Sequence, residues 1–152
     1  MFIKMPDNHQ KNIATFIHLS TFSRFIIPLG NYIAPIVLWS INKNKGAFID
    51  AHGKQAINFQ ISILLYTVII GMITVPFFIF NFFGGIGFID FNGFQDFHIN
   101  LGKPSPLLYL TGFIGLLGIV AFILELVFII TASLKARDGL NYNYPFTINF
   151  IK

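Results

Sequence analysis

Two long apolar runs with almost no charged residues constrain this chain more than any other feature. The first covers residues 55–89, and the second covers residues 104–134 with Glu125 as its only charged residue. A helix that crosses a bilayer needs about 20 mostly apolar residues, and each run is longer than that. A soluble domain of 152 residues could not bury both runs. The sequence therefore predicts an all-α integral membrane protein.

The composition excludes several other classes of protein. Charged residues make up 11% of the chain, whereas soluble domains contain about 25%. The net charge of +4 forms no basic stripe, so nucleic acid is not an expected partner. Cysteine is absent, which excludes disulfides, thiolate metal sites and cysteine nucleophiles. The N-terminal charges are not followed by a small-residue cleavage site, so we expect the first apolar segment to be retained.

The order of polar and apolar segments predicts one membrane domain over residues 1–152, a compact bundle of three to four transmembrane or re-entrant helices. Residues 13–41 contain Arg24, Pro28, Gly30 and Pro35. They form either one span kinked at Pro28 or a re-entrant pair of half-helices that turns at residues 28–31, and we expect a broken helix. Full spans are predicted at 56–83 and 107–134, with a Phe-rich loop at 84–106 and a tail at 135–152.

The basic residues predict how the chain is oriented in a bacterial inner membrane. Positive side chains concentrate on the cytoplasmic side. The loop at 42–55 and the C-terminal tail share one side because two full spans separate them, and together they hold six basic and two acidic residues. The loop at 84–103 holds one basic and two acidic residues. The C-terminus is therefore predicted to be cytoplasmic and the Phe-rich loop exoplasmic.

Two periodic patterns have structural interpretations. Phenylalanine recurs every third residue at 88, 91, 94 and 97, which is typical of a segment at the membrane interface, although a partner could also dock there. Gly112, Gly115 and Gly118 recur at the same spacing, and small residues allow membrane helices to approach closely. We expect these glycines to pack against another helix.

Glu125 is the most informative single residue because an ionisable group inside a span is costly and suggests function. Depth counting along the helices places Asn31, Ser62 and Tyr66 near it. We expect a neutral, hydrogen-bonded carboxyl that faces the bundle. It is either structural, joining helices, or part of a proton, ion or substrate site.

Other polar residues cluster before and inside the second apolar run. His18 and Arg24 lie in the first segment, and spacing offers them no anionic partner at a matching depth. His52, Asn58 and Gln60 belong to the dense polar block at 50–60. This block can cap and pack a helix, and His52 can sense pH. The sequence has no set of residues at the spacing of metal ligands, and it has no nucleophile paired with a base. We therefore predict no catalytic residue, no metal and no cofactor.

Four segments carry a resemblance to a known family. They read FIHLS at 16–20, IPLGNYIAP at 27–35, IDAHGKQAINFQIS at 49–62 and YNYPFTI at 142–148. They resemble a bacterial domain-of-unknown-function family of small multi-pass membrane proteins, which is grouped as similar to the twenty-kilodalton subunit of the chloroplast inner-envelope protein translocon. The resemblance implies three or four helices, a cytoplasmic C-terminus and no assigned reaction. The loop at 84–103 is longer than in that family, so the resemblance implies no shared partner on the outer face.

Two functions from different classes follow. The first is a non-enzymatic inner-membrane subunit or accessory factor, associated with protein translocation or envelope assembly, whose partners are lipid and other membrane proteins. The alternative is a small oligomeric conductor of ions or solutes with a polar path around Glu125. A membrane enzyme acting on lipid would need a convergent acid, base and nucleophile, which the sequence does not offer. Oligomeric state would separate the first two, because so few helices enclose a pore only as a ring.

Overall fold

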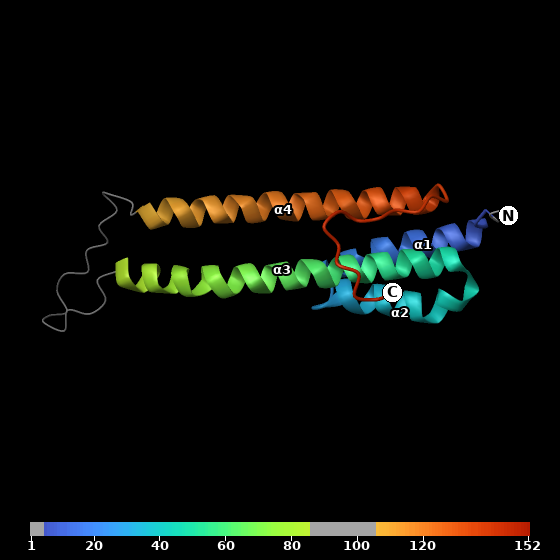
Figure 1. The fold of residues 1–152 in the computed structure, drawn as a ribbon, viewed down its shortest axis with the longest axis horizontal. Coiled ribbons are helices and arrows are strands. Elements are labelled where there is room, and N and C mark those ends of the chain that lie inside the picture. Colours follow the sequence, from blue (N-terminus) through green and yellow to red (C-terminus); the bar gives the residue numbers. More distant parts are fainter. Residues whose placement is uncertain (1–4, 86–105) are drawn as a thin grey trace, which may run out of the picture. The chain divides into compact units, whose positions relative to one another are not determined.

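The computed structural model describes residues 5–85 and 106–152, and most of these residues are helical, with no strand among them (Figure 1). The helices, in chain order, are α1 (Asn8–Leu19), the 3-10 helix η1 (Ser20–Phe25), α2 (Gly30–Asn42), the 3-10 helix η2 (Lys43–Lys45), α3 (Ala47–Gly85) and α4 (Pro106–Arg137). The predicted Phe-rich loop, with its phenylalanines at 88, 91, 94 and 97, lies outside the described residues.

The first apolar segment is two short helices that pack against each other, not one continuous helix. Asp7 caps α1, since its side chain accepts a hydrogen bond from the Gln10 amide at 2.7 Å. α1 has 12 residues and α2 has 13, so each is only about 20 Å long, too short to cross a hydrocarbon core of about 30 Å.

A tight turn at residues 26–29 separates η1 from α2. Leu29 adopts the left-handed conformation with φ of 60°, which is unfavourable for a residue with a side chain. Gly30 begins α2, and a Cβ there would lie 2.6 Å from the Ser23 carbonyl oxygen. Glycine at position 30 therefore allows the turn to close onto η1.

Among the described residues, two helices are long and apolar enough to cross a membrane, Ala47–Pro76 within α3 and Tyr109–Arg137 within α4. α3 begins earlier than the predicted span at 56–83. Its first turns are stabilised by contacts that the apolar pattern does not reveal. Asp50 pairs with Lys54 at 2.6 Å and accepts a hydrogen bond from Trp39 Nε1 at 2.9 Å. Ile49 is fully buried against Ile17.

The chain divides into two compact units, Met1–Tyr66 with Leu124–Lys152, and Thr67–Ile123. The first unit contains both buried clusters. In one, α3, α4 and the tail meet through Phe59, Ile129 and Tyr144, and in the other, α1 and α3 meet through Ile17 and Ala56. All the candidate site residues belong to this unit.

The second unit is apolar on its surface. Met72, Ile73 and Phe113 are among its many exposed hydrophobic side chains. A Cβ built on Gly112, Gly115 or Gly118 would meet no atom of the described residues within 4 Å. Within this unit, the described residues therefore show no close packing on these glycines, and the expectation that they pack against another helix stays a prediction. Such apolar exposure is what lipid contact requires.

The end of α4 leads into a tail without regular secondary structure. Gly139, with φ of 79°, follows the helix. The Gly139 amide bonds to the Ala136 carbonyl at 3.0 Å and the Leu140 amide bonds to the Lys135 carbonyl at 2.9 Å. This is the Schellman arrangement, in which a glycine satisfies the last carbonyls of a helix. It turns the chain so that residues 141–152 return to α3.

Candidate functional site

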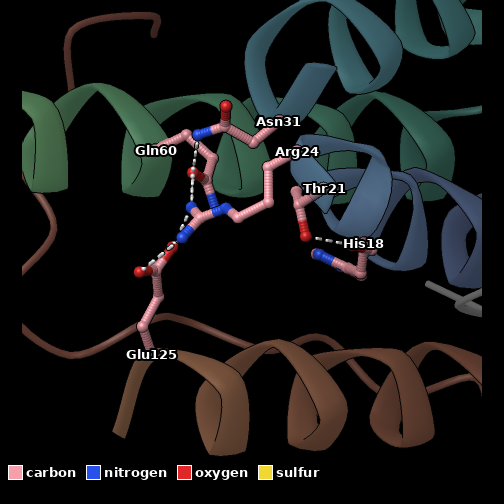
Figure 2. A network of polar contacts seen from close by, with 6 residues as sticks. All are labelled: His18, Thr21, Arg24, Asn31, Gln60 and Glu125. Atoms are coloured by element: carbon pink, nitrogen blue, oxygen red, sulfur yellow. Dashed lines mark hydrogen bonds and ion pairs between the residues drawn. The ribbon is translucent and has the colours of Figure 1, made fainter. Parts of the chain in front are cut away.

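A buried ion pair between Arg24 and Glu125 lies at the centre of the first unit (Figure 2). Arg24 Nη1 donates to Glu125 Oε2 at 3.0 Å, and Nη2 donates to Oε1. The two parallel bonds match the planar guanidinium to the carboxylate. The side chain of Glu125 is 6% exposed and that of Arg24 is 21% exposed. Both charges are therefore largely removed from solvent and depend on each other.

Two amides complete this polar core. Gln60 Oε1 accepts hydrogen bonds from Arg24 Nη2 at 3.1 Å and from Asn31 Nδ2 at 2.8 Å. The Gln60 amide nitrogen lies 3.4 Å from Glu125 Oε1, where it donates a longer bond. Four segments, η1, α2, α3 and α4, thus each supply one side chain, and Figure 2 shows these four converging. The network fixes the register of the helices on which it lies.

The structure corrects the predicted environment of Glu125. The carboxyl does face the interior, but it is ion-paired, so the prediction of a neutral group is wrong. Arg24 is its direct partner, although spacing assigned Arg24 no anion. Asn31 reaches it only through Gln60, while Ser62 and Tyr66 have other partners. Depth counting ran back along the helix only as far as Asn31 and so did not reach Arg24, which lies in η1 beyond the turn at residues 26–29 and pairs with Glu125.

A second buried chain of hydrogen bonds joins three aromatic residues. The Tyr144 hydroxyl lies 2.9 Å from His18 Nδ1, and His18 Nε2 lies 2.8 Å from His52 Nδ1. Thr21 Oγ1 donates to the His18 carbonyl at 2.7 Å, as Figure 2 shows. Burial, aided by the neighbouring His52, lowers the pKa of His18 to about 3. His18 lies in α1, outside the two candidate spans, and it is neutral at physiological pH.

The remaining predicted residues of α3 bind the C-terminal tail. Asn58 donates to the Ile151 carbonyl at 3.0 Å and accepts from the Ile151 amide at 2.9 Å. Ser62 Oγ accepts from the Ile148 amide at 2.8 Å, and the Tyr66 hydroxyl donates to the Phe146 carbonyl at 2.8 Å. Backbone groups need hydrogen-bond partners wherever water is excluded. The polar residues of α3 supply them to a segment that has no secondary structure of its own.

Sequence reasoning missed the tail as part of the site. Tyr144 stacks on Phe59 with ring centroids 4.1 Å apart and an interplanar angle of 11°. Burial raises the pKa of the Tyr144 hydroxyl well above its usual value, and nearby Tyr142 and Glu125 add to the shift. The signal in the sequence was the polar spacing in α3, where Asn58, Ser62 and Tyr66 recur every four residues. That spacing marks a polar stripe on one helix face.

The arrangement holds helices of the first unit together. No group of three or more His, Asp or Glu side chains in the described residues is placed to hold a metal ion. Each charged or imidazole group of the core is engaged by another side chain of the chain itself. The fold and the site thus define a class, a small protein whose described part is helical, with two helices long and apolar enough to cross a membrane and a buried, ion-paired polar core.

The chain belongs to the magnetosome magnetite crystal formation protein family, a bacterial family of small proteins, whose model matches residues 9–151. No curated protein and no solved structure matches it. The match covers every segment that carried the sequence resemblance. It supports the part of the resemblance that assigns the chain to a bacterial family of small proteins. Nothing supports similarity to the chloroplast translocon subunit, and a role in translocation has no support either.

Proposed function

We propose that this chain is a non-enzymatic integral protein of the bacterial inner membrane, or of a compartment derived from it, and acts as an accessory factor in magnetite crystal formation. The family match over residues 9–151 carries this proposal. The two apolar helices support the membrane location. Association with protein translocation is not part of the proposal.

The internal use of the polar residues supports a structural role. Arg24 and Glu125 join η1 to α4, His18 and His52 join α1 to α3, and Asn58 holds the tail. Such contacts rigidify a membrane domain and present its remaining surface to lipid and to other membrane proteins. We therefore propose that the chain works by binding partners.

Complementation tests the proposal. In a magnetosome-forming bacterium that lacks its own gene of this family, expression of this chain should restore the number and size of magnetite crystals, counted by electron microscopy. Membrane fractionation of the same cells should recover the chain with the magnetosomes. A chain that reaches these membranes without changing the crystals would contradict the role in crystal formation. Recovery only in the soluble fraction would contradict the membrane location.

The alternative is an oligomeric conductor with a polar path around Glu125, and the geometry supports it less well. Both carboxylate oxygens are occupied by Arg24, and Gln60 approaches one of them. A permeating ion would have to displace this guanidinium. Proton or ion flux into vesicles containing the purified chain, abolished by Glu125→Gln while the fold is retained, would favour the conductor over the accessory factor.

A further inference from the structure

An open pocket of about 370 Å³ lies where the tail crosses the first turns of α3. Residues from 51–58 form one wall, and residues from 141–152 form the other. The pocket is separate from the Arg24–Glu125 pair, neither member of which lines it. Its volume is within the range of small-molecule sites.

The lining of the pocket is rich in hydrogen-bond donors and has no carboxylate side chain. Of its 11 residues, two are lysines, Lys54 and Lys152, and five carry side-chain amides. The side chains of Asn141, Asn143 and Asn149 have no hydrogen-bond partner among the described residues. Ammonium and amide N–H groups together are the donors that oxyanions bind.

Lys54 is only partly neutralised by its neighbour. Its ammonium contacts Asp50 Oδ2 at 2.6 Å, outside the pocket lining. Asp50 also accepts from Trp39 Nε1 at 2.9 Å, so its negative charge is shared between two donors. The Lys54 side chain remains 30% exposed. An ammonium has three donors, and Asp50 occupies one side of it.

His52 gives an independent indication of a ligand. The residue is 1% exposed, it lines the pocket, and its Nε2 is buried without a hydrogen-bond partner. The Leu140 backbone is a weak hydrogen-bond partner of the ring, but no bond of ordinary geometry reaches Nε2. A buried polar atom left without a hydrogen-bond partner is costly. Because His52 lines the pocket, a ligand bound there could supply that hydrogen bond.

The hydrogen-bond chain determines whether that nitrogen carries a proton. If the Tyr144 hydroxyl donates to His18 Nδ1, then His18 Nε2 donates to His52 Nδ1, and His52 keeps its proton on Nε2. In the opposite direction, His52 donates to His18 and His18 donates to the Tyr144 oxygen. The Tyr144 proton would then have no acceptor, in addition to the unpartnered His52 Nε2. The first direction leaves fewer groups unsatisfied. It makes His52 Nε2 a donor, which suits an anion.

We propose that this pocket binds a phosphate group, held by Lys54, Lys152, His52 and the free asparagine amides. The volume leaves room for the phosphate and for a group esterified to it. The pocket lies at the first turns of the candidate span Ala47–Pro76, so the phosphate comes either from a lipid headgroup or from free phosphate. This inference does not depend on the proposed role in crystal formation.

Thermal unfolding of the purified full chain in an uncharged detergent tests the proposal, followed by the fluorescence of Trp39, the only tryptophan. In one arm, inorganic phosphate replaces chloride at equal ionic strength. In the other, the chain is placed in vesicles of an uncharged glycolipid, which has no phosphate, either alone or mixed in equal parts with phosphatidylglycerol. A ligand that binds only the folded state raises the unfolding temperature. The pocket variant is Lys54→Gln with Lys152→Gln, and the charge-matched control is Lys135→Gln with Arg137→Gln.

We expect stabilisation that the pocket variant loses and the control keeps, with binding weakened about tenfold for each ammonium removed. A response to inorganic phosphate identifies free phosphate as sufficient. A response to the phosphatidylglycerol vesicles alone identifies the lipid headgroup. If the pocket variant does not fold, Asn149→Asp should abolish the response by repulsion, while Asn149→Ser keeps most of it. No response in either arm, or equal loss in the pocket and control variants, would overturn the proposal.

Discussion

At the residue scale, Arg24 and Glu125 show how a charge is tolerated in an apolar helix. Glu125 lies in the candidate span Tyr109–Arg137 and is 5% exposed. Its charge is compensated by a guanidinium from η1, which lies outside both candidate spans. The desolvation of both groups is offset only while they stay paired.

Removing one partner of the pair should therefore destabilise the fold more than removing both. We expect Glu125→Gln to lower the free energy of unfolding by about 3 kcal/mol, because it leaves the guanidinium buried and unpaired. Arg24→Gln should have a similar effect, and the double variant should recover most of the loss. Unfolding of all four proteins in mixed detergent gives the coupling energy directly. Additive losses in the double variant would show that the two residues do not act as a pair.

His18 predicts how stability depends on pH. Its pKa is about 3 in the folded chain and about 6.5 in an unfolded one. The unfolded state therefore binds more protons between these values, and stability falls as the pH falls from 6.5 toward 3. We expect the unfolding temperature of the chain to drop between pH 7 and pH 4.5, measured in detergent by circular dichroism. His18→Gln should show a smaller drop over the same range, and an equal drop would exclude His18 as the cause.

At the scale of elements, two short helices and a tail without secondary structure depend on local contacts more than on apolar periodicity. The turn before α2 requires a residue without a side chain at position 30, and the tail requires the polar stripe of α3. Each requirement predicts the effect of a single substitution.

Gly30→Ala should destabilise the first unit. The added Cβ would lie 2.6 Å from the Ser23 backbone carbonyl, which cannot move as a flexible side chain can. We expect a loss of about 1–3 kcal/mol, as for other overpacked sites. Gly118→Ala is the matched control, because its Cβ would meet no described atom within 4 Å and alanine favours helix. Chemical denaturation of both variants compares them, and equal effects would contradict the close approach at Gly30.

Asn58→Ala should release the end of the tail. It removes the two hydrogen bonds to the Ile151 backbone, which we expect to cost about 1–3 kcal/mol. Hydrogen exchange measured by mass spectrometry should show faster exchange at Ile148 and Ile151. Asn149→Ala removes an amide that has no described partner and should leave the tail protected. Unchanged exchange in Asn58→Ala would show that the tail is held by Tyr144 and its apolar contacts instead.

At the scale of the whole molecule, orientation in the membrane remains a prediction from the basic residues. We expect a cysteine at Lys45 to be labelled from the cytoplasmic side and a cysteine at Asn92 from the opposite side. An impermeant thiol reagent applied to intact cells and to lysed cells distinguishes the two, and the absence of native cysteines makes both labels specific. Labelling of Asn92→Cys only after lysis would reverse the assignment.

The sequence alone determined the helical class, the approximate positions of the two long apolar helices and the inward direction of Glu125. These features depend on the length of apolar runs and on the cost of a charge in lipid, which are local properties of the chain. Only the tertiary structure decided that Arg24 is the partner of Glu125, that His18 meets His52 and that residues 144–151 lie on α3. The physical reason is that a 3-10 helix, one left-handed residue and a helix-ending glycine set these directions. The backbone angles at these places determine where the following helix or tail lies, and residue spacing carries no information about them.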